Sequence, residues 1–363
     1  MSEWHPRIVT IGEIHPHPNA DRLELTYVDD YPVVVGIDTF HTGDKAVYLP
    51  IDTILPEAEV WDNVRQYTSK GRIKAAKLRG VLSLGMLHKM SEVEWNTFYD
   101  FSSRLFSQIY DEGTDGATEE RAIIEFFGLT KYEPPIRNSG YNLRGSSGAL
   151  PDIPAFPKYT DLEALRKYPN VLNEGEWVYV TEKLHGSNGR WGWIGGEFLV
   201  GSRNQRLDAD GDSIWARVAR QLNLQEILSE YPEMVFYGEV LGVQDLMYGL
   251  EPGNLDVVFF DILDTRSLIP GIVHRADSPT FKFKDNYALH NFEIFTKLKV
   301  AKVLYEGPFF ADTVKSFAEG RSTYANHVRE GVVIRPNMER FHPEIGRCIL
   351  KHIGSDYLLR KGG

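Results

Sequence analysis

Cysteine and long apolar segments are scarce in this sequence of 363 residues. Cys348 is its single cysteine, which excludes an intrachain disulfide and a zinc site built on cysteines. The longest apolar runs, such as residues 257–260, have the length of a β-strand and are far too short to span a bilayer. The first residues lack the basic and apolar regions of a signal peptide. We therefore expect a cytoplasmic protein with no membrane attachment.

Positive charge is also in short supply. The 40 basic residues are outnumbered by 51 acidic ones, which gives a net charge of −11. Taken alone, this balance argues against a nucleic-acid partner. The charge is uneven, however, because residues 63–91 contain seven bases and no acid. Local, salt-sensitive contact with a few phosphates is therefore compatible with the sequence.

The pattern along the chain indicates three parts. Residues 1–130 combine short strands with a helical stretch in 92–129, and residues 131–155 form a linker rich in proline and glycine. Residues 156–363 show a mixed α+β pattern. In this third part we predict strands near 177–182, 234–241 and 256–263, and helices in 213–228, 290–306 and 312–325.

Lys183 is the strongest candidate for chemistry. It ends a strand-like run and is followed by Gly186, whose missing side chain would let the backbone approach a phosphate. A lysine attacks phosphorus only as the neutral amine, so we expect its pKa to be lowered. The spacing Lys-x-x-Gly also occurs at Lys77 and Lys351. The spacing alone therefore does not identify a nucleophile.

Charged residues beside apolar strands follow Lys183. They are Arg203, Glu239, Asp261, Glu330 and Lys351. A charge in such a place is costly to bury without a partner. Acids that converge on one sheet face suit a metal or a ribose, and cations suit phosphates. Phe260 is a candidate for stacking on a purine base.

The order of these segments resembles the motif series of the covalent nucleotidyltransferases, the superfamily of ATP-dependent ligases and RNA capping enzymes. The matching residues are Lys183-x-x-Gly186, Ser202-Arg203, Gly238-Glu239, Phe260-Asp261, Glu330-Gly331 and Lys351. His185 stands where DNA ligases and capping enzymes typically have Asp. The box from Glu182 to Asn188 is similar to that of nick-sealing RNA ligases.

The resemblance implies an ATP-dependent RNA ligase that joins 3′-hydroxyl and 5′-phosphate ends, at nicks in an RNA duplex or RNA/DNA hybrid, in RNA repair. It implies lysyl-AMP and RNA-adenylate intermediates, with ATP as AMP donor and Mg²⁺ or Mn²⁺ as the metal. The implied catalytic residues are Lys183, His185, Asn188 and Arg203. The implied nucleotide-binding residues are Glu182, Gly186, Glu239, Phe260, Glu330 and Lys351. The implied metal ligands are Glu330 and Asp261.

One departure keeps alternatives open. The last motif of the superfamily commonly carries two lysines two residues apart, but Ile349 stands two residues before Lys351. Arg347, Arg360 and Lys361 are candidates to compensate. A DNA ligase, a guanylyltransferase and a non-catalytic RNA-binding protein with the same fold therefore remain alternative interpretations. The oligomeric state does not follow from the sequence.

The front of the chain carries a second resemblance. Residues 14–23, 33–36 and 74–87 look like the OB-fold tRNA-binding module of synthetase-associated proteins. The implied fold is an OB-like β-barrel followed by a mixed antiparallel-sheet nucleotidyltransferase domain, similar to ATP-grasp ligases. The implied RNA-binding residues are Arg72, Lys74, Lys77 and Arg79. An OB barrel binds the nucleic-acid backbone in a cationic groove.

Overall fold

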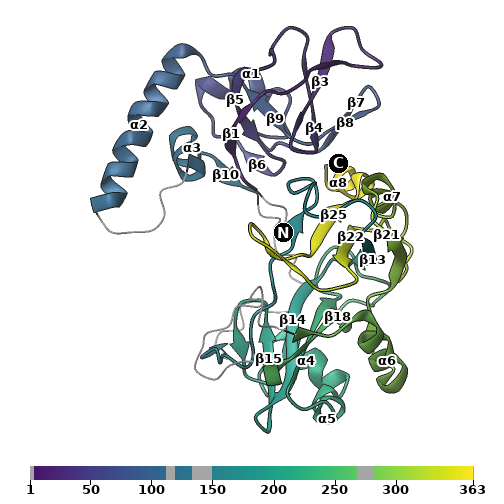
Figure 1. Cartoon of the computed structure of the whole chain (residues 1–363). Helices are drawn as coiled ribbons and strands as arrows, with labels where there is room; N and C mark the ends of the chain where they lie inside the picture. Colours follow the sequence, from purple (N-terminus) through teal and green to yellow (C-terminus); the bar gives the residue numbers. More distant parts are fainter. Residues whose placement is uncertain (1–3, 112–118, 133–148, 268–281, 363) are drawn as a thin grey trace. The chain divides into compact units, whose positions relative to one another are not determined.

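The computed structural model describes residues 4–111, 119–132, 149–267 and 282–362. The chain folds into two compact units (Figure 1). One comprises residues 1–135, 166–169 and 358–363, and the other comprises residues 136–165 and 170–357. Most of the expected linker, residues 133–148, lies outside the described residues.

The first unit is built from short antiparallel strands. Its strands are β1 (Arg7–Thr10), β2 (His15–Pro16), β3 (Leu23–Val28), β4 (Tyr31–Gly36), β5 (Lys45–Leu49), β6 (Thr53–Ile54), β7 (Ala76–Leu78), β8 (Val81–Ser83), β9 (Met86–His88) and β10 (Thr130–Lys131). Within the described residues, β1–β5–β9 and β2–β3–β4 pair as separate sheets, and hydrogen bonds do not close one continuous barrel.

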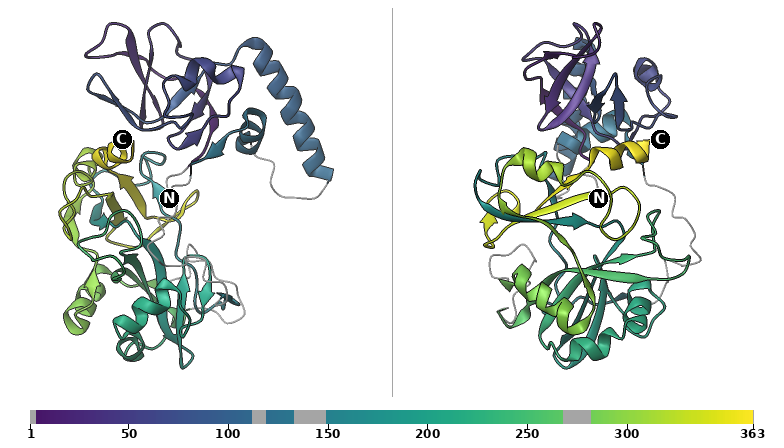
Figure 2. Two further views of the ribbon diagram at one scale, coloured as in Figure 1. Left: turned by 180° about the vertical axis from the view of Figure 1, so that it is seen from behind. Right: turned by 90° about the vertical axis from the view of Figure 1, so that its right-hand side faces the viewer.

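Helices cover one side of this unit. They are α1 (Asp62–Arg65), α2 (Glu92–Asp111) and α3 (Glu119–Phe127), with a 3₁₀ turn at Glu59–Trp61. Trp61 is fully buried and packs against Phe127 of α3, with ring centroids 5.1 Å apart. The predicted helical stretch of residues 92–129 thus consists of two helices that pack on each other (Figure 2).

The second unit contains two larger sheets. Its strands are β11 (Ala149–Leu150), β12 (Glu163–Ala164), β13 (Trp177–Lys183), β14 (Ser187–Ile194), β15 (Glu197–Ser202), β16 (Arg206–Leu207), β17 (Met234–Leu241), β18 (Asp256–Asp264), β19 (Lys282–Phe283), β20 (Lys299–Val300), β21 (Val303–Pro308), β22 (Gly331–Pro336), β23 (Phe341–His342), β24 (Gly346–Arg347) and β25 (Leu350–Ile353). One sheet has the order β11–β16–β15–β14–β17–β18–β19, and the other has the order β12–β25–β22–β13–β21.

Helices pack on the sheet that contains β14, β17 and β18. The helices of the unit are α4 (Ile214–Gln221), α5 (Leu224–Ser229), α6 (Asn286–Thr296) and α7 (Ala311–Ser316), and α8 (Ser355–Gly362) begins at its end. The ribbons of α4, α5 and α6 lie beside this sheet (Figure 1). Their apolar residues share one core with the strands β14, β17 and β18. In the part of the chain that the structure describes, no helix combines the length and apolar character needed to cross a membrane.

Three predicted helices differ from the structure. The prediction of one helix over 213–228 is wrong, because Asn223 has a left-handed φ of 53° that separates α4 from α5. The prediction of a helix over 290–306 is wrong beyond Thr296, where the chain forms β20 and β21 and pairs with β18 and β13. The helix predicted in 312–325 ends at Ser316. In residues 299–306, long-range strand pairing overrides the local helical spacing.

Candidate active site

The turn between β13 and β14 connects the two large sheets. β13 ends at Lys183 in one sheet, and β14 begins at Ser187 in the other. Only three residues, 184–186, join them, and these include His185 and Gly186. The motif residues predicted from the sequence therefore lie where the chain crosses from one sheet to the other.

Lys183 forms an ion pair with Glu330. β13 and β22 pair so that Lys183 lies opposite Gly331, which places the preceding residue, Glu330, beside the ammonium. The distance from Nζ to Oε2 is 2.9 Å, and the two side chains are only 16% and 11% exposed. The structure thus brings together two residues that are far apart in the sequence, as the ordered motifs predicted.

Glu239 contributes a second carboxylate to this pocket. It lies on β17 opposite Asn188 of β14, and its Oε1 accepts a hydrogen bond of 2.9 Å from the backbone N–H of Gly186. Burial raises the pKa of Glu239 to about 7, against the charge of Lys183 and together with that of Glu330. The side chain is therefore poised to gain or lose a proton near neutral pH.

The pKa of Lys183 shifts in the direction opposite to the one expected from the sequence. Burial lowers the pKa of Lys183, but the carboxylates of Glu330 and Glu239 outweigh burial and hold the pKa above its usual value. The prediction of a lowered pKa is wrong because acids line the pocket where the sequence suggested burial or cations. Burial opposes ionisation of Glu330 as well, yet Lys183 and His185 lower the pKa of that carboxyl to about 2.

His185 is fixed by residues that the sequence did not reveal. Its Nε2 lies 2.7 Å from Oδ1 of Asp245, and its backbone N–H donates to the hydroxyl of Tyr248 at 2.8 Å. The hydroxyl of Tyr357 lies 3.1 Å from Nδ1. Both ring nitrogens of His185 therefore have a polar partner, which fixes the orientation of the imidazole. These partners lie far from His185 in the sequence, and no local motif marks them.

Glu182 lies on the other face of β13 from Lys183, because neighbouring residues of a strand point to opposite faces. It is 3% exposed, and its Oε2 accepts hydrogen bonds from the backbone and hydroxyl of Thr323 at 2.8 and 2.7 Å. Its Oε1 is buried without a hydrogen-bond partner among the described residues. A buried acceptor of this kind is available to a donor group of a ligand.

Three other predicted residues have different surroundings. Asn188 has a buried Oδ1 with no hydrogen-bond partner in the described structure. Arg203 follows β15 and forms an ion pair with Asp161. Lys351 lies on β25, and its Nζ donates to the carbonyl of Leu162 at 2.5 Å.

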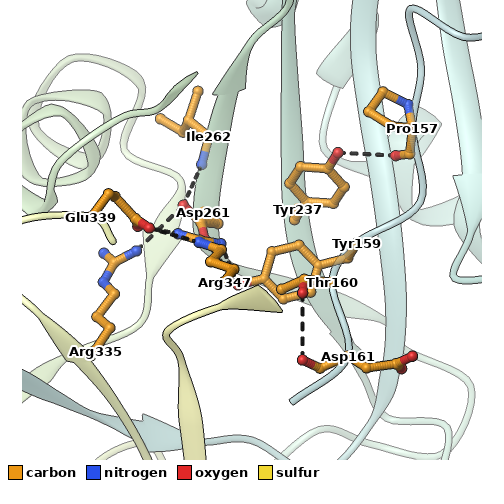
Figure 3. A network of polar contacts seen from close by, with 10 residues as sticks. All are labelled: Pro157, Tyr159, Thr160, Asp161, Tyr237, Asp261, Ile262, Arg335, Glu339 and Arg347. Atoms are coloured by element: carbon orange, nitrogen blue, oxygen red, sulfur yellow. Dashed lines mark hydrogen bonds and ion pairs between the residues drawn. The ribbon is translucent and has the colours of Figure 1, made fainter. Parts of the chain in front are cut away.

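Asp261 does not join the cluster around Lys183. It is fully buried on β18 and pairs with the guanidinium groups of Arg335 and Arg347 (Figure 3). The structure therefore compensates its charge within the protein, which argues against the predicted role as a metal ligand. Its neighbour Phe260 packs against Tyr159, with ring centroids 5.0 Å apart.

Glu330 offers one carboxylate oxygen to a metal. Among the described residues, no group of three or more His, Cys, Asp and Glu side chains is arranged to hold a metal. The Oε2 of Glu330 is buried and accepts no well-aligned hydrogen bond, although it lies 2.9 Å from the ammonium of Lys183. Mg²⁺ is commonly held by one or two carboxylates together with substrate phosphates. Glu330 fits such a shared site.

The predicted RNA-binding residues of the first unit fall into two classes. Arg72 is engaged within the protein, since it forms an ion pair of 2.6 Å with Asp52 and lies 3.5 Å from the ring centroid of Tyr132. Lys77 and Arg79 are exposed at the tip of the β7–β8 hairpin, and Lys74 is half-buried. Lys77 and Arg79 are therefore better placed than Arg72 to meet a phosphate.

Family models match both parts of the chain. A model of the RNA ligase family matches residues 176–353, and a model of an OB-fold domain matches residues 7–90. The chain is also 34% identical over 90 residues to the β subunit of phenylalanine–tRNA ligase from Wolbachia sp. subsp. Brugia malayi. That match covers 24% of this chain and 10% of the relative, so the chain spans about a tenth of its length.

Solved structures of an RNA ligase from Naegleria gruberi share the fold. The structure with pyrophosphate has a TM-score of 0.72 at 24% identity and covers 99% of this chain and 98% of that chain. A variant with AMP and Mn has a TM-score of 0.71 at 23% identity, with 99% of each chain covered. A variant with ATP and Mn has a TM-score of 0.69 at 24% identity, with 98% of each chain covered.

Proposed function

We propose that the protein is an ATP-dependent ligase that seals nicks in duplex RNA during RNA repair. Residues 176–353 match the model of the RNA ligase family. The reaction joins a 3′-hydroxyl to a 5′-phosphate through lysyl-AMP and RNA-adenylate intermediates. The observation that carries the proposal is the buried Lys183 at the end of β13, facing Glu330 and Glu239. The ATP and AMP complexes of the Naegleria gruberi ligase support the choice of nucleotide.

In the first step Lys183 attacks the α-phosphorus of ATP. A bond forms between Nζ and phosphorus, the bond to the bridging oxygen of the β-phosphate breaks, and pyrophosphate leaves. Nζ must lose one proton to become a nucleophile and a second as the P–N bond forms, and both pass to solvent. The ion pair with Glu330 opposes the first loss. A divalent cation held by Glu330 and the phosphates would offset the charge that keeps Lys183 protonated.

The neighbouring side chains orient the nucleotide. The unpartnered Oε1 of Glu182 is proposed to accept from the amino group of adenine, and Glu239 to bind the ribose. His185, fixed by Asp245 and Tyr357, is proposed to lie beside the phosphates together with Asn188. Positioning and electrostatics of this kind supply most of the rate in phosphoryl transfer.

Two further phosphoryl transfers complete the reaction. The RNA 5′-phosphate attacks the phosphorus of lysyl-AMP, which releases Lys183 and forms RNA-adenylate. The 3′-hydroxyl then attacks the 5′-phosphorus, and AMP leaves as the phosphodiester forms. Arg203 is proposed to contact the ribose or the RNA end, and Lys351 to neutralise the α-phosphate.

The first prediction is that the protein takes up label from ATP labelled at the α-phosphate. Mg²⁺ is present, and the label is measured on the denatured chain. Lys183→Arg keeps a cation beside Glu330 but has no amine to attack, so we expect complete loss of label with the fold preserved.

Controls separate the competing functions. Lys77→Ala and Lys351→Ala both keep the attachment point at Lys183. Lys77→Ala is expected to take label like the wild type, whereas Lys351→Ala is expected to take it more slowly, because Lys351 is proposed to neutralise the α-phosphate. Label from GTP in place of ATP would identify a guanylyltransferase, and sealing of DNA but not RNA ends would identify a DNA ligase. A folded wild-type chain that never takes label contradicts the enzyme and leaves a non-catalytic RNA-binding protein.

A further inference from the structure

Asp261 belongs to a polar cluster that the reaction above does not use. Its Oδ2 accepts hydrogen bonds from the hydroxyl of Tyr159 at 2.8 Å and from Nη1 of Arg347 at 2.6 Å. Its Oδ1 accepts from Nη1 of Arg335 at 3.3 Å and from the backbone of Ile262 at 3.1 Å (Figure 3). A carboxylate offers about four lone-pair positions. All four are occupied by protein donors, so none is left for a metal.

Arg347 is fully enclosed in the cluster. Its side chain is 0% exposed, and its Nε donates to Glu339 at 3.0 Å, beside a second bond from Nη2 to the same carboxylate. Its guanidinium carbon lies 3.5 Å from the ring centroid of Phe283. A buried charge with this many partners is strongly destabilised when one partner is removed. Each partner of Arg347 in the cluster is therefore important for stability.

The cluster joins elements of different sheets. Asp261 lies on β18, Arg335 on β22 and Arg347 on β24. β18 also changes register here: Asp261 pairs with Tyr237, while Phe259 pairs with Gly238. Phe260 is the extra residue of this bulge. A bulge re-aims the side chain that it carries, so the direction of the Phe260 ring depends on how Asp261 is held.

We propose that Asp261, Arg335 and Arg347 are positioning residues that hold the β18 bulge so that Phe260 presents its ring to the adenine base. The inference rests on the proposed ATP-dependent function. It gives Asp261 a role through Phe260 in place of a role at the metal. Tyr159 supports the same arrangement, since its hydroxyl bonds Asp261 and its ring packs on Phe260.

The test compares nucleotide and metal requirements of lysyl-adenylate formation. Arg347→Lys keeps the charge but loses the planar fork of donors, and Asp261→Asn loses the charge. Both variants are expected to raise KM for ATP about tenfold, to change kcat less than about threefold, and to leave the Mg²⁺ concentration at half-maximal rate unchanged. ATP binding measured by calorimetry should weaken by the same factor.

Two further variants serve as a control and as a test of whether the effect on KM acts through Phe260. Arg340 forms a two-pronged pair with Glu176 at 2.6 and 2.7 Å in the same unit, so Arg340→Lys is expected to keep the wild-type KM. Phe260→Leu removes the ring, and combining it with Arg347→Lys should give no further rise in KM, because both changes act on the same contact.

Three outcomes overturn the inference. They are a folded Arg347→Lys protein with wild-type KM, an additive double variant, and an Asp261→Asn protein that needs more Mg²⁺ at unchanged KM. If Arg347→Lys does not fold, Arg335→Lys is measured in its place. A wild-type chain that binds ATP but takes no label contradicts the proposed ligase reaction alone, and the calorimetric comparison still decides the inference.

Discussion

Charged residues in the pocket of Lys183 determine one another's protonation. Glu330 stays ionised because its pKa lies at about 2, and its charge helps to keep Lys183 protonated. Glu239 shares the pocket, but burial raises its pKa to about 7. The three groups therefore gain and lose protons at different pH values. Because these pKa values differ from those of the unfolded chain, the unfolding free energy depends on pH.

Replacing Glu239 by Gln is expected to remove a pH-dependent part of the unfolding free energy. Folding raises the pKa of this carboxyl from 4.5 to about 7. An acid whose pKa is raised by folding stabilises the native state below about pH 4.5, and this contribution is lost as pH rises to about 7. The loss is roughly 3 kcal/mol at most.

Urea denaturation at several pH values measures this effect. The difference in unfolding free energy between wild type and Glu239→Gln should change across this window, in favour of wild type at the acidic end. Glu174→Gln serves as the control, because Glu174 is exposed. Parallel curves for wild type and Glu239→Gln would contradict the assignment.

Among the elements, the short turn from β13 to β14 imposes a strict steric demand. A Cβ on Gly186 would lie 2.2 Å from the carbonyl oxygen of Val240 and 3.0 Å from Cγ of Glu239. The sequence suggested that this glycine allows approach to a phosphate. The structure adds a different requirement, which is close contact between the turn and β17.

Gly186→Ala is expected to lower the unfolding free energy by about 2 kcal/mol and to impair lysyl-adenylate formation. The added methyl group must push the turn away from β17, which disturbs the bond from Gly186 to Glu239 and moves Lys183. Gly12→Ala is the matched control, because nothing lies within 4 Å of its Cβ position. Wild-type stability and labelling of Gly186→Ala would show that the turn relaxes freely.

The elements also show how far the sequence could be interpreted alone. Apolar strands such as β17 matched their predicted bounds, and the ordered motifs named Lys183, Glu239 and Glu330, which the structure brings together. The helix predicted over 290–306 failed because β21 is stabilised by pairing with β13, which lies far away in the sequence. Asp245 was missed for the same reason, since only the tertiary fold brings it to His185.

Across the whole molecule, the net charge of −11 conceals a local basic segment of the sequence. Lys77 and Arg79 are exposed at the β7–β8 hairpin, where the adjoining residues carry no acid between positions 63 and 91. The hairpin tip is held in place, because the side-chain amide of Asn19 donates to the carbonyl of Arg79 at 3.0 Å. RNA contact through this tip would involve few phosphates.

Reversing both charges, Lys77→Glu with Arg79→Glu, is expected to weaken sealing of an RNA nick about tenfold at moderate salt. The slope of the logarithm of affinity against the logarithm of salt concentration should fall by about two, one for each lost phosphate contact. Lysyl-adenylate formation should stay unchanged, since the reaction uses no residue of this hairpin.

The same reversal at Lys297 and Lys315, outside the basic segment, provides the control for net charge. Gel-shift titrations of nicked RNA over a range of salt concentrations measure both variants. Equal losses in the two variants would mean that overall charge, and not the hairpin, governs RNA binding.

The alternation of side chains along β13 provides a way to assess whether refolded protein has the native strand register. Glu182 and Lys183 are neighbours on opposite faces, and the strand is paired on both sides, with β22 and β21. A slip of one residue turns both side chains to the opposite faces of the sheet, and a slip in one direction puts Glu182 where Lys183 belongs. A misregistered chain would therefore accept no AMP even if it were compact and soluble. The number of AMP groups bound per chain would thus count correctly threaded molecules, a gauge of folding fidelity that bulk spectroscopy does not provide.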